Sequence, residues 1–180
     1  MHKWSLEKFT YPWEHIVIDN FLPEEIFKIL LCSIVNKDFA FSKSDFNDIK
    51  ITYEDYYKQE VNDFFKQYIN ETFITEYFSA YRNYSALESH FTFQTTLLGD
   101  TSPIHCDNIV KILSLVLYTS PEIQIGTTLY DVNKKYSKTI DWIPNRAFIF
   151  CPLSDITYHS YKNEISVFRN TLNFNLLSKD

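Results

Sequence analysis

Residues 166–177 read Ser-Val-Phe-Arg-Asn-Thr-Leu-Asn-Phe-Asn-Leu-Leu, and their pattern is the strongest indication of how the chain folds. The side chains alternate between two chemical types, as they do in a β-strand with two different faces. The apolar side chains on one face are Phe168, Leu172, Phe174 and Leu176, and the polar side chains on the other are Arg169, Thr171, Asn173 and Asn175. We expect the apolar face to pack beneath helices and the polar face to line a wet pocket.

The same periodicity extends backward along the chain. Alternation over residues 91–98 and apolar runs over 15–19, 109–118, 125–130 and 146–151 predict further strands. Pro23, followed by Glu24 and Glu25, is typical of a helix start, and we expect a helix over 23–35. Aromatic residues at helical spacing predict one or two more helices over 53–80, including Tyr56 and Tyr57. The sequence predicts an α+β protein with a mainly β core.

The organisation of the chain indicates one unit. The 180 residues contain no linker rich in Pro, Gly or Ser and no repeat, so we expect a single domain over 1–180. Residues 1–80 are expected to be mostly helical support, and residues 88–177 are expected to form the β core.

Composition excludes several functional classes. A net charge of −6 argues against nucleic-acid binding, and only two glycines, with no GxGxxG or Walker motif, argue against a Rossmann nucleotide site. Three scattered cysteines without a CxxC pair exclude a zinc ribbon and predict reduced thiols. We see neither a signal peptide nor a run of apolar residues that could span a membrane, and we expect a cytoplasmic protein without a membrane partner.

The chemistry is concentrated in His105-Cys106-Asp107. On an extended chain, His105 and Asp107 share one face and can reach one metal ion, whereas Cys106 points away and is not expected to be a ligand. His159 lies on a later strand, and Arg169 follows ten residues beyond it on the polar face. Two histidines and one carboxylate with open positions form the facial triad of non-haem Fe(II) oxygenases, whereas structural zinc takes four protein ligands.

These residues resemble the 2-oxoglutarate/Fe(II)-dependent dioxygenases, in particular the prolyl-4-hydroxylase-like branch. Further stretches resemble motifs of that branch in order and spacing, namely 17–25 (its strand-to-helix opening), 98–100 (a Gly-Asp pair), 126–130 (a Gly-Gly-Glu-Thr strand with one glycine missing), 143–150 (a proline turn into an apolar strand) and 169–174 (the closing strand). The resemblance covers about residues 15–177.

The resemblance implies a double-stranded β-helix, which is a jelly roll of the cupin type, with N-terminal supporting helices. It implies that His105, Asp107 and His159 hold Fe(II) as the catalytic centre. It implies that Arg169 binds 2-oxoglutarate, with Thr171 beside it. Where the branch has a tyrosine that contacts the same carboxylate, this chain has Thr96. The implied reaction uses O2, releases succinate and CO2 and hydroxylates a small-molecule or peptide substrate, and the role of ascorbate stays open.

Two other readings stay open. A cupin-like metal-binding or sensor module could use the same fold without oxygenase activity, although such a module does not need Arg169. A structural or partner-binding protein could carry these histidines incidentally. The sequence identifies neither the substrate nor the oligomeric state, which could be monomer or homodimer. Tyr118 and Trp142 could contact a substrate, but packing is the expected role of both.

Overall fold

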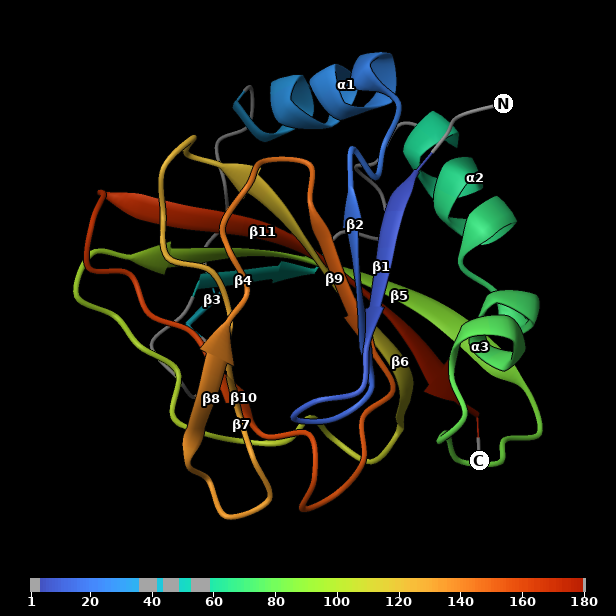
Figure 1. Cartoon of the computed structure of the whole chain (residues 1–180). Helices are drawn as coiled ribbons and strands as arrows, with labels where there is room; N and C mark the ends of the chain where they lie inside the picture. The colour runs from blue at the N-terminus through green and yellow to red at the C-terminus, as the bar shows by residue number, and fades with distance from the viewer. Residues whose placement is uncertain (1–3, 36–41, 44–48, 53–58, 180) are drawn as a thin grey trace.

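The computed structural model describes residues 4–35, 42–43, 49–52 and 59–179 of the chain. Two antiparallel sheets form the centre of the structure (Figure 1). The larger sheet has eight described strands, in the order β1 (Ser5–Phe9), β2 (His15–Asp19), β9 (Ala147–Phe150), β6 (Lys111–Ser120), β11 (Phe168–Ser178), β5 (Leu87–Leu97), β4 (Ile49–Thr52) and β3 (Ser42–Lys43). The smaller sheet has the order β10 (His159–Ser160), β7 (Thr128–Tyr130) and β8 (Tyr136–Thr139).

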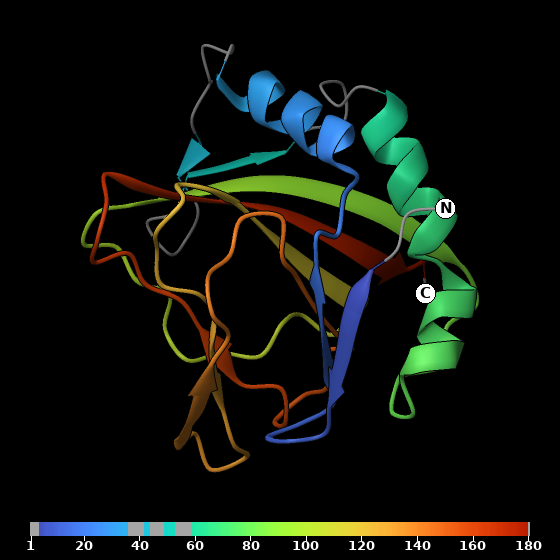
Figure 2. The same ribbon diagram turned by 45° about the horizontal axis from the view of Figure 1, so that its top comes forward.

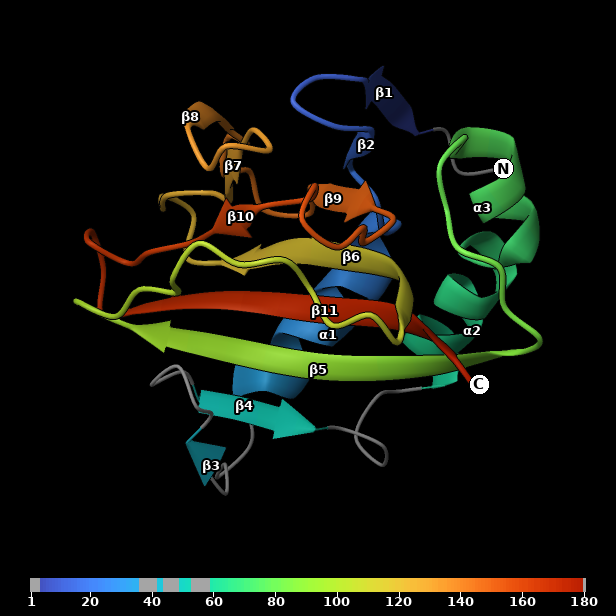
Figure 3. The same cartoon turned by 90° about the horizontal axis from the view of Figure 1, so that it is seen from below.

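The two sheets form the expected double-stranded β-helix. Helices α1 (Glu24–Val35), α2 (Gln59–Tyr68) and α3 (Glu71–Tyr77) lie on the outer side of the larger sheet. Figure 2 shows α1 above β5 and β11 and the smaller sheet below them. Figure 3 shows β6, β11 and β5 side by side, with α1 behind them. Among the described helices, none is long and apolar enough to cross a membrane.

The two faces of β11 differ as the alternation predicts. Leu172, Phe174 and Leu176 are buried in the main hydrophobic core beneath the helices. Phe168, which was expected on the same buried face, is 42% exposed at the start of the strand and lies outside that core. The ring of Phe65 on α2 lies 5.0 Å from that of Phe174 and 5.2 Å from that of Phe91 on β5, measured between centroids. Burying such aromatic side chains contributes a large share of the hydrophobic stabilisation. The opposite face of β11 is therefore left to a cavity between the sheets.

The helix predictions are largely confirmed. The expected helix over 23–35 is α1, which begins directly after Pro23. The expected helical stretch over 53–80 contains α2 and α3, and the Asn70 side chain accepts a hydrogen bond from the backbone N–H of Phe73 at the start of α3. The part of that prediction over 53–58, with Tyr56 and Tyr57, lies outside the described residues.

Residues 1–80 were expected to be mostly helical support, but they contribute strands as well as helices. The predicted strand 15–19 is β2, but it pairs with β9 and so belongs to the larger sheet. The strand β1, which no pattern predicted, pairs with β2 along its whole length. Most of β1 is exposed, so its side chains lack the alternation that marks a half-buried strand. Backbone pairing with β2 decides its conformation instead.

Candidate active site

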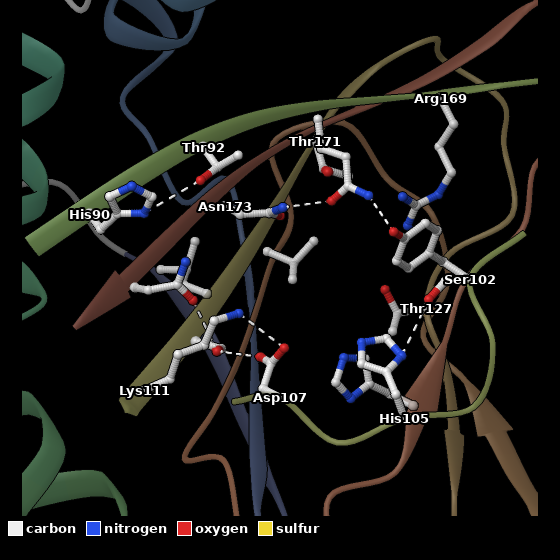
Figure 4. A pocket seen from close by; sticks show the side chains of 17 residues that line it. His90, Thr92, Ser102, His105, Asp107, Lys111, Thr127, Arg169, Thr171 and Asn173 are labelled. Carbon is white, nitrogen blue, oxygen red and sulfur yellow. Dashed lines mark hydrogen bonds and ion pairs between the residues drawn. The ribbon is translucent and has the colours of Figure 1, made fainter. Parts of the chain in front are cut away.

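A cavity of about 340 Å³ lies against the polar face of β11, between the two sheets (Figure 4). It is lined by His90, Thr92, Gln94, Ser102, His105, Asp107, Lys111, Ser114, Leu115, Val116, Thr127, His159, Tyr161, Arg169, Thr171, Asn173 and Asn175. Strands β5, β6 and β11 supply one wall, whereas the segment before β6 and strand β10 supply the other. The predicted polar inner face of β11 is thus the wall of a real cavity.

His105, Asp107 and His159 meet in this cavity. One ligand atom from each lies within 4.8 Å of the other two, which is close enough for all three to hold one metal ion. The backbone brings the two histidines together, because the His105 N–H donates to the His159 carbonyl at 3.0 Å and the reverse bond is 2.9 Å. His105 and Asp107 then reach the same point because they are two residues apart on an extended segment.

Backbone carbonyls orient both imidazole rings. Nδ1 of His105 lies 2.8 Å from the Pro103 carbonyl oxygen, and Nδ1 of His159 lies 3.0 Å from the Thr157 carbonyl oxygen. A carbonyl oxygen can only accept, so Nδ1 carries the proton in each ring and Nε2 carries the lone pair that a metal needs. Burial also lowers the pKa of His159 to about 4, which keeps this imidazole neutral at pH 7.

Asp107 is held as a carboxylate by two neighbours. Its Oδ1 lies 3.0 Å from Lys111 Nζ, and its Oδ2 accepts a 2.6 Å hydrogen bond from the Ser114 hydroxyl. Burial raises the pKa of Asp107, whereas Lys111, the nearby His159 ring and the Ser114 hydroxyl lower it, and the net effect holds the pKa well below its usual range. Asp107 therefore offers a fixed negative charge beside the two imidazole rings.

Arg169 places a positive charge at one end of the cavity. The residue is only 1% exposed, and its Nε donates to the Ile125 carbonyl at 3.1 Å. The guanidinium carbon lies 5.0 Å from the ring centroid of Trp142 and 5.7 Å from that of Tyr118, and these two rings stack on each other. Tyr118 and Trp142 thus pack against the arginine, in keeping with the packing role expected for them. A buried guanidinium facing a cavity suits a carboxylate ligand.

The two threonines expected beside Arg169 differ in position. Thr171 lines the cavity, whereas Thr96 is not part of its lining. Thr96 pairs with Arg169 in the strand register and is fully buried, and its hydroxyl makes no hydrogen bond in the structure. The side chains of Gln94 and Tyr161 form part of the wall at this end instead, and the Gln94 amide donates to the Tyr161 hydroxyl.

Sequence reasoning missed several lining residues. Tyr161, Lys111 and Thr127 reach the cavity from segments whose side-chain direction no periodic pattern indicated. Ser114 had a usable signal, because it interrupts an apolar strand two residues before Val116 on the same face. A polar residue inside an apolar strand is a reason to look for a polar partner, and Asp107 is that partner.

Cys106 lies apart from the convergent atoms. Its neighbours are in the segment Asp155–Thr157, and burial raises the pKa of its thiol. The cluster of possible metal ligands consists of His105, Asp107 and His159 and does not include Cys106. All three cysteines of the chain are free thiols, with Cys151 buried and Cys32 exposed.

Comparisons with known proteins support the fold. No protein-family model and no curated protein sequence matches this chain. A prolyl hydroxylase from Trichoplax adhaerens, solved in complex with a hypoxia-inducible-factor peptide, is 16% identical with a TM-score of 0.68, over 92% of this chain and 84% of that one. A Pseudomonas putida prolyl-4-hydroxylase is 13% identical with a TM-score of 0.68, over 100% and 95% of the two chains.

A third similar structure is the viral collagen prolyl hydroxylase of Paramecium bursaria Chlorella virus-1, solved as a 2-oxoglutarate complex. It is 14% identical with a TM-score of 0.65, over 91% of this chain and 96% of that one. At such low identity these likenesses establish the double-stranded β-helix fold, and the chemistry has to be argued from the site.

Proposed function

We propose that this chain, as a single domain over residues 1–180, is an Fe(II)- and 2-oxoglutarate-dependent dioxygenase that hydroxylates its substrate. The observation that supports this proposal most is the combination of two features in one cavity. The possible ligand atoms of His105, Asp107 and His159 converge there, and the buried Arg169 guanidinium lies at one end of it. A metal site alone would not need that arginine.

The donor set fits Fe(II). Two imidazole nitrogens and one carboxylate leave positions open on the metal, as in non-haem Fe(II) oxygenases. Backbone carbonyls accept hydrogen bonds from Nδ1 of both rings and so orient the rings, as groups behind metal-binding histidines usually do. When bound, Fe(II) and 2-oxoglutarate supply the oxidising chemistry with O2, and succinate and CO2 are the expected co-products.

The chain's own residues do the binding and positioning. Asp107 offsets part of the metal's charge and is kept deprotonated by Lys111 and Ser114. Arg169 binds the far carboxylate of 2-oxoglutarate, and Thr171 lies two residues further along the same wall. The rings of Tyr118 and Trp142 pack against Arg169 and exclude water from it, which strengthens a charged contact.

Anaerobic metal titration followed by 2-oxoglutarate addition tests the proposal. Fe(II) should bind once per chain, and 2-oxoglutarate should then produce a visible charge-transfer absorbance. Under air the wild type should form succinate, and EDTA should abolish that activity. Asp107→Asn should weaken metal binding by more than the roughly 10–100-fold that loss of an outer-shell partner causes, because it removes the charge of a ligand itself. Asp63→Asn, on the exposed surface of α2, is the matched control and should bind as the wild type does.

The outcomes separate the alternatives. Metal binding without any effect of 2-oxoglutarate would favour the metal-binding or sensor module. Equal metal affinity in the Asp107→Asn and Asp63→Asn variants would remove the proposed centre altogether.

A further inference from the structure

The cavity continues well beyond the end that holds Arg169. Along β11, the inward residues after Arg169 are Thr171, Asn173 and Asn175, and Asn175 pairs with His90 of β5. Six residues of strand span about 20 Å. Figure 4 shows Arg169 and His90 at opposite ends of the labelled group, with Asp107 between them and nearer the opposite wall. A five-carbon diacid bound to Arg169 would occupy only the end of the cavity near Arg169.

The far end is rich in hydrogen-bonding groups. Asn173 Nδ2 donates to Gln94 Oε1 at 2.8 Å, while Asn173 Oδ1 is buried and makes no hydrogen bond in the structure. Asn175 lies 3.0 Å from the Ser114 hydroxyl, and Thr92 lies beside His90. A buried acceptor without a donor is costly, so Asn173 Oδ1 points to a ligand that supplies one.

The far end also carries positive charge. Lys111 Nζ bonds Asp107 Oδ1 at 3.0 Å, and an ammonium has two further hydrogens to donate. Among the described residues that line the cavity, Asp107 is the single carboxylate, and it is also the proposed metal ligand. Lys111 and Asp107 together are neutral, and the Lys111 charge becomes available to a small anion when the proposed metal takes up the charge of Asp107.

The far end is poorly suited to a proline ring. Among the described lining residues, Tyr161 is the single aromatic residue other than histidine, and its ring lies 5.0 Å from the Arg169 guanidinium carbon, at the other end. The far end is lined mainly by amides, hydroxyls, an imidazole and an ammonium, and its apolar lining residues are the aliphatic Leu115 and Val116. Binding an apolar ring there would leave several of these groups without water or a partner.

We propose that the substrate is a small polar anion with hydrogen-bond donors, whose anionic group binds Lys111 and whose donor binds Asn173 Oδ1. This inference rests on the proposed function, because it takes the Arg169 end to be filled by 2-oxoglutarate. Lys111 has two tasks in this arrangement. It stabilises the Asp107 carboxylate and also selects an anionic substrate.

Binding measurements that need no turnover test the substrate class. The protein is loaded with Zn(II) and the unreactive 2-oxo acid analogue N-oxalylglycine, and calorimetry or saturation-transfer NMR then measures three probes. D-glycerate and glycerol are a matched pair, and the tripeptide Pro-Pro-Gly represents a prolyl substrate. D-glycerate should bind at least about tenfold more tightly than glycerol, because only glycerate offers a charged partner to Lys111.

Two variants locate the binding. Lys111→Gln should abolish the preference for glycerate over glycerol, and Asn173→Asp should weaken glycerate binding about tenfold by placing a like charge beside it. The control Asn133→Asp makes the same replacement on the turn between β7 and β8, away from the lining residues, and should bind like the wild type. Metal content of each variant is measured alongside.

The possible failures are distinguishable. Equal binding of glycerate and glycerol, or tighter binding of the tripeptide than of glycerate, would overturn the substrate class while leaving the proposed function intact. An unchanged preference in Lys111→Gln together with unchanged glycerate binding in Asn173→Asp would do the same. Failure of the wild type to bind N-oxalylglycine in the presence of Zn(II) would overturn both proposals.

Discussion

Replacement of Arg169 is the sharpest test of how the cavity binds its cosubstrate. The guanidinium is 1% exposed, Ile125 fixes its Nε, and three aromatic rings lie within 5.0–5.7 Å of its guanidinium carbon. A carboxylate bound there gains charge-assisted hydrogen bonds in a site largely shielded from water. Each such bond contributes about 1.5–3 kcal/mol. Loss of a single one corresponds to a decrease in affinity of roughly ten- to a hundredfold.

The wild type, Arg169→Lys and Arg169→Ala should therefore differ in their affinity for 2-oxoglutarate. In Arg169→Ala the concentration of 2-oxoglutarate that gives half-maximal Fe(II) charge-transfer absorbance should rise by roughly a hundredfold or more, since a bidentate contact is lost. Arg169→Lys should recover part of the affinity, because an ammonium keeps the charge but lacks the planar fork. Metal affinity should stay at the wild-type value in both variants, because Arg169 is not among the convergent ligands.

Thermal unfolding of each variant shows whether weaker 2-oxoglutarate binding results from loss of the folded state. Arg169→Ala leaves a space between Tyr118, Trp142 and Tyr161, so some loss of stability is expected even if the fold is kept. A folded variant that binds Fe(II) normally and titrates with the same 2-oxoglutarate midpoint as the wild type would refute the assignment of Arg169. The metal-binding or sensor reading would then be preferred.

Three further predictions concern single positions. In Gly126→Ala a Cβ would overlap the Ile140 carbonyl oxygen. The variant should therefore have a free energy of unfolding about 1–3 kcal/mol lower in urea titrations and should bind 2-oxoglutarate more weakly. An unchanged midpoint of urea unfolding would contradict this. Burial lowers the pKa of His15 to about 4 from an unfolded value near 6.5. The free energy of unfolding of the wild type should therefore fall by up to about 3 kcal/mol as the pH falls from 6.5 to 4, and this effect should be absent above pH 6.5. The pH dependence of urea unfolding should be shallower in His15→Gln, and equal slopes would count against the prediction. Cys106→Ser should keep most of the metal affinity that Asp107→Ala loses, as measured by metal content after dialysis.

Local sequence patterns predict several elements of the fold and part of the candidate site. The alternation in residues 166–177 is a property of neighbouring side chains, and it correctly predicts the cavity-lining face of β11 and the buried face except at Phe168, which is exposed at the start of the strand. The Pro-Glu-Glu start predicts α1 for the same reason, because capping and first-turn charge act within a few residues. The spacing of His105 and Asp107 needs only the geometry of an extended chain to place both on one face.

The tertiary structure decided which distant residues share the cavity. His159 meets His105 because their backbones pair across the two segments, and no periodicity records such a pairing. Lys111, Tyr161 and Thr127 reach the same space from three different segments, while Thr96 is left out of the lining despite its place beside Arg169. Side-chain alternation tells which face a residue takes, but only the packing of the sheets decides what that face encloses.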